Sequence, residues 1–133
     1  MKIFFSGSIR GGRDEDDKKV FKTIHNILKK HGTVFTELIE DEMLTAPEEI
    51  YSTDEEIFQR DIKWLGEVDL VVAEVSKPSI GVGYEIGRAE AMKKKILCLY
   101  RSGNVSAMVL GNPGINKVEY TVDNLEEKLA KLL

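Results

Sequence analysis

Strand-like and helix-like segments alternate from one end of this chain to the other, and this alternation is the feature that most constrains its fold. Strands are expected at about residues 2–6, 33–37, 68–74, 96–100 and 117–121. Helical patterns fill the gaps, including a last helix expected to begin at Asp123, with Glu126 completing a capping box. The pattern predicts a single α/β domain over residues 1–133 with a mostly parallel sheet.

Five such strands favour a flavodoxin-like, Rossmann-like three-layer sandwich whose parallel sheet has the strand order 2-1-3-4-5. In sheets of this kind, ligands bind beyond the carboxyl ends of the strands, at the switch point between the first and third strands. Two loops rich in glycine and serine follow those two strands. The topology therefore predicts that both loops belong to one site.

The first loop, residues 6–13, reads Ser-Gly-Ser-Ile-Arg-Gly-Gly-Arg. Its glycines expose backbone N–H groups, Ser8 adds a hydroxyl donor, and Arg10 and Arg13 each offer a planar guanidinium to an anion. Neither the Walker pattern nor the dinucleotide fingerprint fits its spacing. The loop is typical of a phosphate site, although a glycine-rich turn with two solvated arginines explains it equally well when it is read by itself.

The second loop, residues 78–85, reads Pro-Ser-Ile-Gly-Val-Gly-Tyr-Glu and places Glu85 where a helix is expected to begin. The free N–H groups of a helix start favour nearby negative charge, so we expect Glu85 to stay ionised. Glu85 is thus the first candidate for a catalytic residue. The alternative is a structural one, in which Glu85 only complements the helix dipole.

A third candidate lies in the helix predicted near 54–66, whose apolar stripe is interrupted at its centre by Asp61. An ionised carboxylate on a core face needs a partner, because burying it unpaired is too costly. Asp61 is expected to pair with Arg10, Arg60 or a backbone amide, to serve in catalysis, or both. Glu74, at the end of the third strand, is expected either to form a wall of the cleft or to cap a neighbouring loop.

Composition narrows the function classes. The net charge of −4 and a pI near 5.3 argue against a general nucleic-acid binder. Cys98 lies alone within an apolar strand run, which predicts a buried thiol in a reducing, cytoplasmic compartment. No membrane span or signal peptide is expected. His25 and His31 lack a second ligand cluster, so no metal site is expected.

Taken together, five segments in the same order over nearly the whole chain resemble the 2′-deoxynucleoside 5′-phosphate N-hydrolases of the nucleoside 2-deoxyribosyltransferase superfamily. They are residues 6–13, Asp61 with Trp64 and Leu65, 71–75 (Val-Val-Ala-Glu-Val), 78–85, and 106–108 (Ser-Ala-Met). The resemblance implies a hydrolase that cleaves the N-glycosidic bond of a nucleoside 5′-monophosphate, without a cofactor, to a free base and a sugar 5-phosphate.

The resemblance also implies roles for individual residues. Glu85 matches the nucleophile that attacks the anomeric carbon, and Asp61 matches a second essential carboxylate, which either protonates the departing base or orients Glu85. The positions that match substrate and phosphate contacts are Gly7, Ser8, Ile9, Arg10, Gly11, Ser79, Gly81, Ser106 and Met108. Ser106 would come from the neighbouring subunit, which implies a homodimer.

One position departs from the family pattern. Phe4 stands where the hydrolases that prefer deoxyribose commonly have a tyrosine, at the end of the first strand. Relatives with phenylalanine there can accept ribonucleotides such as CMP, so we expect weak selection between ribose and deoxyribose, or else a slower enzyme.

Two other functions stay open at this stage. One is a deoxyribosyltransferase, which would use unphosphorylated nucleosides, and the other is a nucleotide-binding module without chemistry. We expect the 40–52 segment to influence base preference, which the sequence does not reveal.

Overall fold

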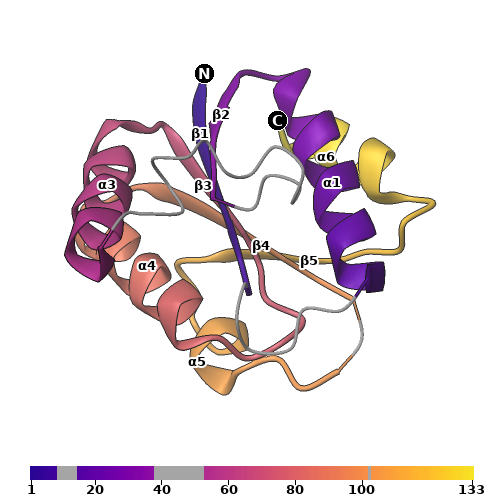
Figure 1. The fold of residues 1–133 in the computed structure, drawn as a ribbon. Helices are drawn as coiled ribbons and strands as arrows, with labels where there is room; N and C mark the ends of the chain where they lie inside the picture. Colours follow the sequence, from indigo (N-terminus) through magenta and orange to yellow (C-terminus); the bar gives the residue numbers. More distant parts are fainter. Residues whose placement is uncertain (9–14, 38–52, 102) are drawn as a thin grey trace.

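The computed structural model describes residues 1–8, 15–37, 53–101 and 103–133, which form a parallel sheet between two layers of helices (Figure 1). The sheet has the order β2-β1-β3-β4-β5, and every neighbouring pair is parallel. Its strands are β1 (Lys2–Gly7), β2 (Thr33–Phe35), β3 (Leu70–Glu74), β4 (Lys95–Tyr100) and β5 (Asn116–Glu119). The predicted fold class and strand order are confirmed.

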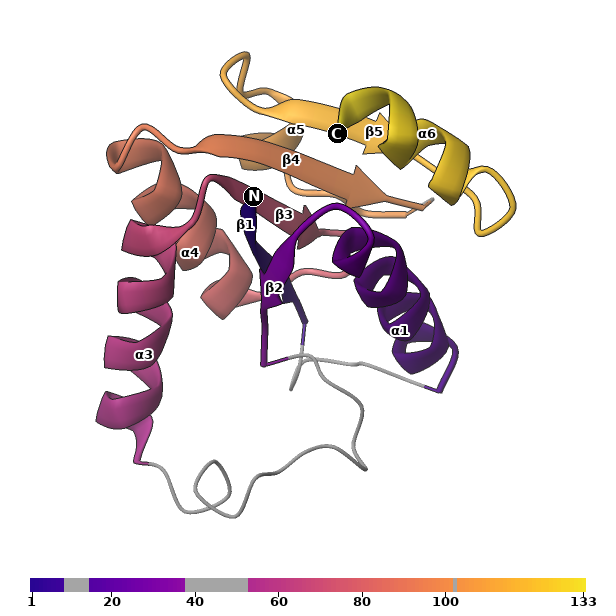
Figure 2. The same cartoon turned by 90° about the horizontal axis from the view of Figure 1, so that it is seen from above.

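Alternate side chains of each strand enter different cores. Ile3, Phe5 and Val72 pack on the side of α1 (Glu15–Lys29) and α6 (Leu125–Leu132). Phe4 and Val71 pack on the side of α3 (Asp54–Glu67) and α4 (Ile80–Ala91). Figure 2 shows these helix pairs on opposite sides of the sheet. The same alternation directs Ser6 to the α3 and α4 side and Glu74 to the α1 and α6 side.

The thiol of Cys98 is fully buried, as predicted, and its burial raises the pKa to about 12, so it is an unreactive thiol at neutral pH. Within the described residues, no helix has the length and apolar character needed to cross a membrane.

The helix caps differ from the predicted ones. α6 begins at Leu125 after Asn124, whose side chain makes no capping hydrogen bond, so the predicted capping box starting at Asp123 is wrong. Glu126 instead accepts a hydrogen bond from Lys30 at 2.5 Å. A capping box is present at α3, where the Thr53 hydroxyl accepts from the Glu56 N–H and the Glu56 carboxylate accepts from the Thr53 N–H.

The start of α3 projects beyond the core that the described residues form. Figure 2 shows it extending past the carboxyl ends of β1 and β2. The predicted apolar stripe is therefore only partly buried: Leu65 is inaccessible, whereas the side chain of Phe58 is 41% exposed. The first turns of α3 thus supply apolar side chains to the wall of a cavity.

Candidate active site

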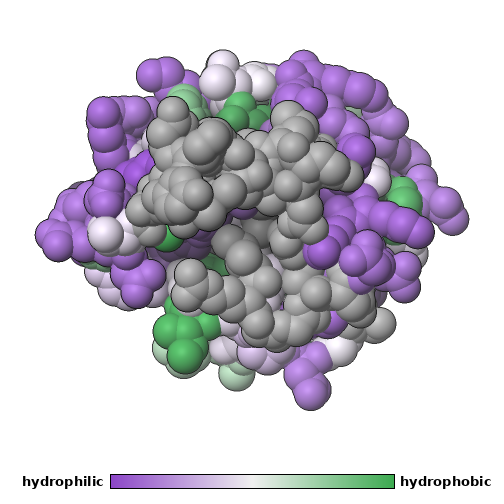
Figure 3. All heavy atoms as spheres, viewed as in Figure 1, coloured by the Kyte–Doolittle hydropathy of each residue, from purple (hydrophilic) through white to green (hydrophobic). Residues whose placement is uncertain are grey.

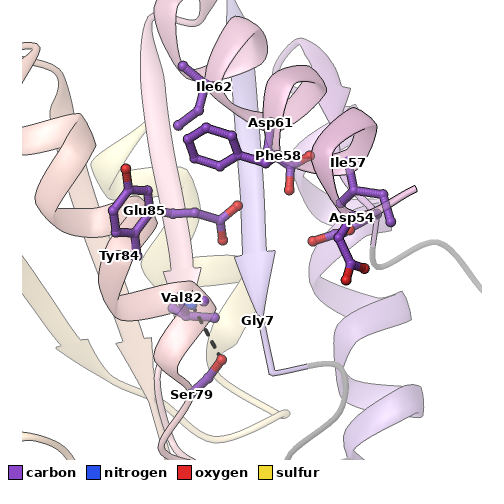
Figure 4. Close-up of a pocket in the computed structure, with 12 residues that line it drawn as sticks. Gly7, Asp54, Ile57, Phe58, Asp61, Ile62, Ser79, Val82, Tyr84 and Glu85 are labelled. Atoms are coloured by element: carbon purple, nitrogen blue, oxygen red, sulfur yellow. Dashed lines mark hydrogen bonds between the residues drawn. The ribbon is translucent and has the colours of Figure 1, made fainter. Parts of the chain in front are cut away.

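A cavity of about 350 Å³ lies at the carboxyl ends of β1 and β3, between α3 and α4. Its lining residues are Gly7, Glu37, Asp54, Ile57, Phe58, Asp61, Ile62, Ser79, Gly81, Val82, Tyr84 and Glu85. Figure 4 shows the carboxylate of Glu85 extending from α4 into the space that the Asp61 carboxylate of α3 faces. The structure therefore brings the two predicted carboxylates and parts of both predicted loops to one place.

Glu85 lies in the second turn of α4, which begins at Ile80, and not at the helix start. Burial raises its pKa to about 8, and although the Ser6 hydrogen bond acts to lower it, the negative charges of Asp61 and Glu37 raise it further. The Ser6 hydroxyl donates to Glu85 Oε1 at 2.7 Å. Contrary to the expectation that Glu85 stays ionised, its surroundings favour the protonated form.

Glu37 is a third carboxylate that the sequence reasoning missed. Carboxylate oxygens of Glu37, Asp61 and Glu85 all lie within 4.8 Å of one another. The signal for Glu37 was its place after the second strand, which ends at Phe35 and not at the predicted residue 37. The strand thus delivers Glu37 to the same edge of the sheet as the two loops.

Arg60 holds two members of this carboxylate group. Its Nη2 lies 3.1 Å from Glu37 Oε2, and its Nε lies 3.2 Å from Asp61 Oδ1. The guanidinium carbon also lies 4.5 Å from the centre of the Trp64 ring. The predicted pairing of Asp61 with Arg60 is confirmed. Three carboxylates this close together could also bind a cation. Here, however, Arg60 already supplies a positive charge to Glu37 and Asp61.

The opposite end of the cavity is polar and lies at the start of α4. Ser79 is the N-cap of this helix, and its hydroxyl accepts from the Val82 N–H at 3.3 Å. Ser79 and Gly81 line the cavity beside Gly7. Ser8, which directly follows Gly7, is not among the lining residues; it is 3% exposed, and its hydroxyl has no hydrogen-bond partner among the described residues. Helix-start N–H groups and serine hydroxyls form a suitable end for an anion.

Several predicted positions lie outside the described residues. They are Ile9, Arg10, Gly11 and Arg13 of the first loop and the whole of the 40–52 segment. The second loop, residues 78–85, is described completely.

Ser106 and Met108 line a different cavity, of about 420 Å³, on the other side of α4. Ser106 is the N-cap of α5 (Ala107–Leu110), and the side chain of Met108 is 84% exposed. Ser79 and Val82 line both cavities. Within one chain, Ser106 is therefore separated from Glu85 by α4.

Phe4 lies inside β1, not at its end as predicted, and is 1% exposed. It is not among the residues that line the cavity of Glu85. Its ring centre lies 6.2 Å from that of Trp64, the residue on which Arg60 stacks. Phe4 therefore reaches the carboxylates through packing, on the same face of β1 as Ser6.

Glu74 belongs to the opposite side of the sheet and forms no wall of the Glu85 cavity. It accepts hydrogen bonds from the Ser76 N–H at 2.6 Å and from the Tyr120 hydroxyl. Of its two predicted roles, the capping of a neighbouring loop is confirmed.

Comparison with known proteins places this geometry in a family. The family described as Nucleoside 2-deoxyribosyltransferase matches residues 3–129. The chain is 45% identical over 135 residues to a 5-hydroxymethyl-dUMP N-hydrolase from Danio rerio, with 97% of this chain and 93% of the relative covered. It is 49% identical over 113 residues to the enzyme of the same name from Homo sapiens, covering 82% of this chain and 64% of the relative.

A solved structure, a CMP N-glycosidase from Clostridium botulinum, has the same fold. Its TM-score is 0.74 at 22% identity, with both chains fully covered at 100%. Because the family match spans residues 3–129 and a relative that is 45% identical covers 97% of the chain, the protein belongs to the nucleoside 2-deoxyribosyltransferase family.

Proposed function

We propose that this protein hydrolyses the N-glycosidic bond of nucleoside 5′-monophosphates, releasing the free base and a (deoxy)ribose 5-phosphate. The observation that carries the proposal is the cavity itself, in which Glu85 faces Asp61 at one end and a helix start with Ser79 forms the other. The relatives named 5-hydroxymethyl-dUMP N-hydrolase support this substrate class, since they share 45% to 49% identity with the chain.

In the first step, ionised Glu85 attacks the anomeric carbon of the sugar. A bond forms between a carboxylate oxygen and this carbon while the carbon–nitrogen bond to the base breaks, and the base leaves with the electron pair and takes up a proton. The product is a glycosyl ester of Glu85. The Ser6 hydroxyl, 2.7 Å from Glu85 Oε1, holds the nucleophile in place.

In the second step, water attacks the same carbon. The ester bond breaks, the Glu85 carboxylate is regenerated, and the proton of the water passes to a neighbouring carboxylate. Retaining glycosidases hold their two carboxyl groups about 5 Å apart, whereas inverting enzymes leave room for an intervening water. Oxygens of Glu85 and Asp61 lie within 4.8 Å, which favours the covalent route.

Asp61 and Glu37 have supporting roles in this scheme. Asp61 either protonates the departing base or orients Glu85. The hydrogen bond from Arg60 Nε to Asp61 Oδ1, at 3.2 Å, holds the Asp61 carboxylate in position for either role. Burial is the main cause of the raised pKa of Glu85, and the negative charges of Asp61 and Glu37 raise this pKa further. We propose that the cluster of Glu37, Asp61 and Glu85 holds the proton that the departing base takes up.

The 5′-phosphate would lie at the polar end of the cavity. Gly7, Ser79 and Gly81 line this end of the cavity. We assign Ser8, which directly follows Gly7 and whose buried hydroxyl has no hydrogen-bond partner among the described residues, and Ile9, Arg10 and Gly11 to the same site. A phosphate at a helix start gains from the exposed N–H groups.

The chemistry is tested by chromatographic detection of free base released from dGMP, dCMP, GMP and CMP. We expect release by the wild type and none by Glu85→Ala. Glu67→Ala is the matched control, because Glu67 is an exposed glutamate at the far end of α3 and should leave release unchanged. No release from any of the four by folded wild type would contradict the proposal.

A deoxyribosyltransferase is the second candidate, because the matched family carries that description. The two functions differ in their use of the phosphate. Deoxyadenosine with free cytosine should give no base exchange under conditions in which the monophosphates are hydrolysed. Exchange as fast as hydrolysis would identify a transferase.

We further propose a cytoplasmic homodimer in which Ser106 of the neighbouring copy completes each phosphate site. The second cavity supports this arrangement, since Ile80, at 95% exposed, and Met108, at 84%, are large apolar side chains on its rim. Figure 3 shows an apolar patch in this region, where α4 and α5 lie near each other. The buried free thiol of Cys98 is consistent with a reducing compartment.

A further inference from the structure

A group of paired charges, in which two buried carboxylates meet two partly exposed cations, lies at the α1 and α6 side of the sheet, away from the proposed catalytic carboxylates. Asp17, in the first turn of α1, is 3% exposed. Lys77 Nζ lies 2.5 Å from Asp17 Oδ2, and Arg101 Nη2 lies 2.6 Å from Asp17 Oδ1. Three segments far apart in the sequence thus meet at one carboxylate.

Arg101 extends this group to the end of β3. Its Nε lies 3.4 Å from Glu74 Oε2, and its backbone N–H donates to Ser76 Oγ at 2.8 Å. Ser76 in turn donates its own hydroxyl to Glu74 Oε2 at 3.1 Å. We call Asp17, Glu74, Ser76, Lys77 and Arg101 the brace.

The brace joins loops that lead to the proposed phosphate site. Lys77 lies in the loop that ends at Ser79, the N-cap of α4. Arg101 directly follows β4 and begins the segment that ends at Ser106, the N-cap of α5. Gly103 adopts a φ of +128°, and a Cβ added to it would lie 3.8 Å from the Ser76 carbonyl oxygen, so the two loops pack closely.

Within the brace itself, all of whose residues the structure describes, negative and positive side chains are equal in number. Two carboxylates, Asp17 and Glu74, face two cations, Lys77 and Arg101. Cations whose charge is already neutralised by buried carboxylates at this distance have little attraction left for a phosphate. This arrangement fits a group that holds loops in place rather than one that binds the ligand.

We propose that the brace is a positioning device for phosphate recognition: the pairing of Arg101 with Asp17 and Glu74 fixes the loops of Ser79 and Ser106 before substrate arrives. The inference rests on the proposed function. A binding site whose loops are already ordered loses less conformational entropy on binding, so loosening the loops weakens recognition of the phosphate more than the chemistry at Glu85.

The primary test is Arg101→Lys, which keeps the positive charge but loses the two-sided contact to Asp17 and Glu74. We expect the KM for the preferred monophosphate to rise about tenfold, with kcat within about twofold of wild type. The inhibition constant of ribose 5-phosphate, which carries the phosphate without a base, should rise by a similar factor. Thermal melting is measured alongside to establish that the variant is folded at the assay temperature.

The matched control is Glu126→Gln. It removes the ion pair between Glu126 of α6 and Lys30, the residue directly after α1; this pair lies on the exposed surface, with both side chains more than 60% exposed. The KM and the ribose 5-phosphate inhibition constant should not change. If Arg101→Lys fails to fold, Lys77→Gln is read in the same way, because the Lys77 side chain is 37% exposed and its loss disturbs the core less.

An unchanged KM and inhibition constant in a folded Arg101→Lys would overturn the inference, as would a fall in kcat at constant KM. Failure of the proposed function gives a different result, namely no base release by the wild type itself.

Discussion

In the proposed mechanism, Glu85 has to lose its proton before it can attack the sugar, yet its surroundings favour the protonated form. Burial is the main cause, and the charges of Asp61 and Glu37 add to it, so that its pKa is about 8. A carboxylate with a raised pKa is also more basic, and such tuning is common at reactive positions. The folded environment therefore stabilises protonated Glu85, whereas the proposed attack on the sugar needs ionised Glu85.

The pH profile of kcat/KM tests this assignment. Because the reactive form is ionised and the pKa is about 8, kcat/KM should rise with pH and level off above about 8. Well below that value the rise should be about tenfold per pH unit. A profile that is flat between pH 6 and pH 9 would contradict a protonated Glu85 in the free enzyme.

Folding stability should respond to pH in the opposite direction. The folded pKa of Glu85, about 8, lies above its ordinary value of 4.5, so the folded state binds the proton more tightly than the unfolded state. The stabilisation is full below pH 4.5 and declines as the pH rises toward 8. Melting temperatures should show this decline in wild type, and Glu85→Gln, which does not titrate, should show less of it.

Phe4 permits a prediction on sugar selectivity, since it provides no hydroxyl near the nucleophile. Hydrolysis of CMP should lie within about tenfold of that of dCMP, and Phe4→Tyr should shift the ratio toward the deoxy substrate. Phe35→Tyr is the control, because Phe35 also packs on Trp64, with ring centres 5.8 Å apart, on the neighbouring strand. A wild-type preference for dCMP of several hundredfold would refute the prediction.

At the scale of elements, α3 is the helix on which the site depends most, because it carries Arg60 and Asp61 and starts at the cavity. The side chains of its first turn are exposed, so we expect the capping box of Thr53 and Glu56 to stabilise the start of the helix.

Thr53→Ala should lower the free energy of unfolding by about 1 kcal/mol, the usual effect of losing an N-cap hydroxyl. Thr23→Ala is the matched control: Thr23 lies within α1, where its hydroxyl only donates to the Lys19 carbonyl, and the helix backbone is satisfied without it. Urea unfolding followed by circular dichroism measures both. Equal effects of the two substitutions would show that the cap has no special role.

The order of the elements could be predicted from sequence because strand-like and helix-like periods alternate clearly, and the strand order then placed both loops at one edge. The ends of elements were less predictable. Expecting the second strand to reach residue 37 placed Glu37 within a strand, whereas β2 ends at Phe35 and frees Glu37 for the site. The pKa of Glu85 depends on Glu37 and Asp61, which only the tertiary structure brings near it.

At the scale of the whole molecule, the proposed homodimer can be tested through the exposed rim of the second cavity. Sedimentation should give about twice the chain mass of 15.0 kDa for the wild type. Met108→Glu should yield a species near 15.0 kDa and lower base release, because a buried charge disfavours the interface that would deliver Ser106.

Val122→Glu is the control for that experiment, since Val122 is an apolar residue, 51% exposed, that does not line the second cavity. It should leave mass and activity unchanged. A monomeric wild type with full activity would contradict the dimer.

Because side chains alternate along β1 and β3, the two faces of the sheet carry different groups: one faces Glu85 and the other faces the brace. On one face, the Ser6 hydroxyl donates a hydrogen bond to Glu85, and on the other face Glu74 belongs to the brace. In the proposed scheme, bond cleavage and loop support thus use the same strands but different side chains. Substrate range can therefore diverge through substitutions on α3 and α4 while the opposite layer keeps the loops in place, so that one scaffold accommodates different leaving groups.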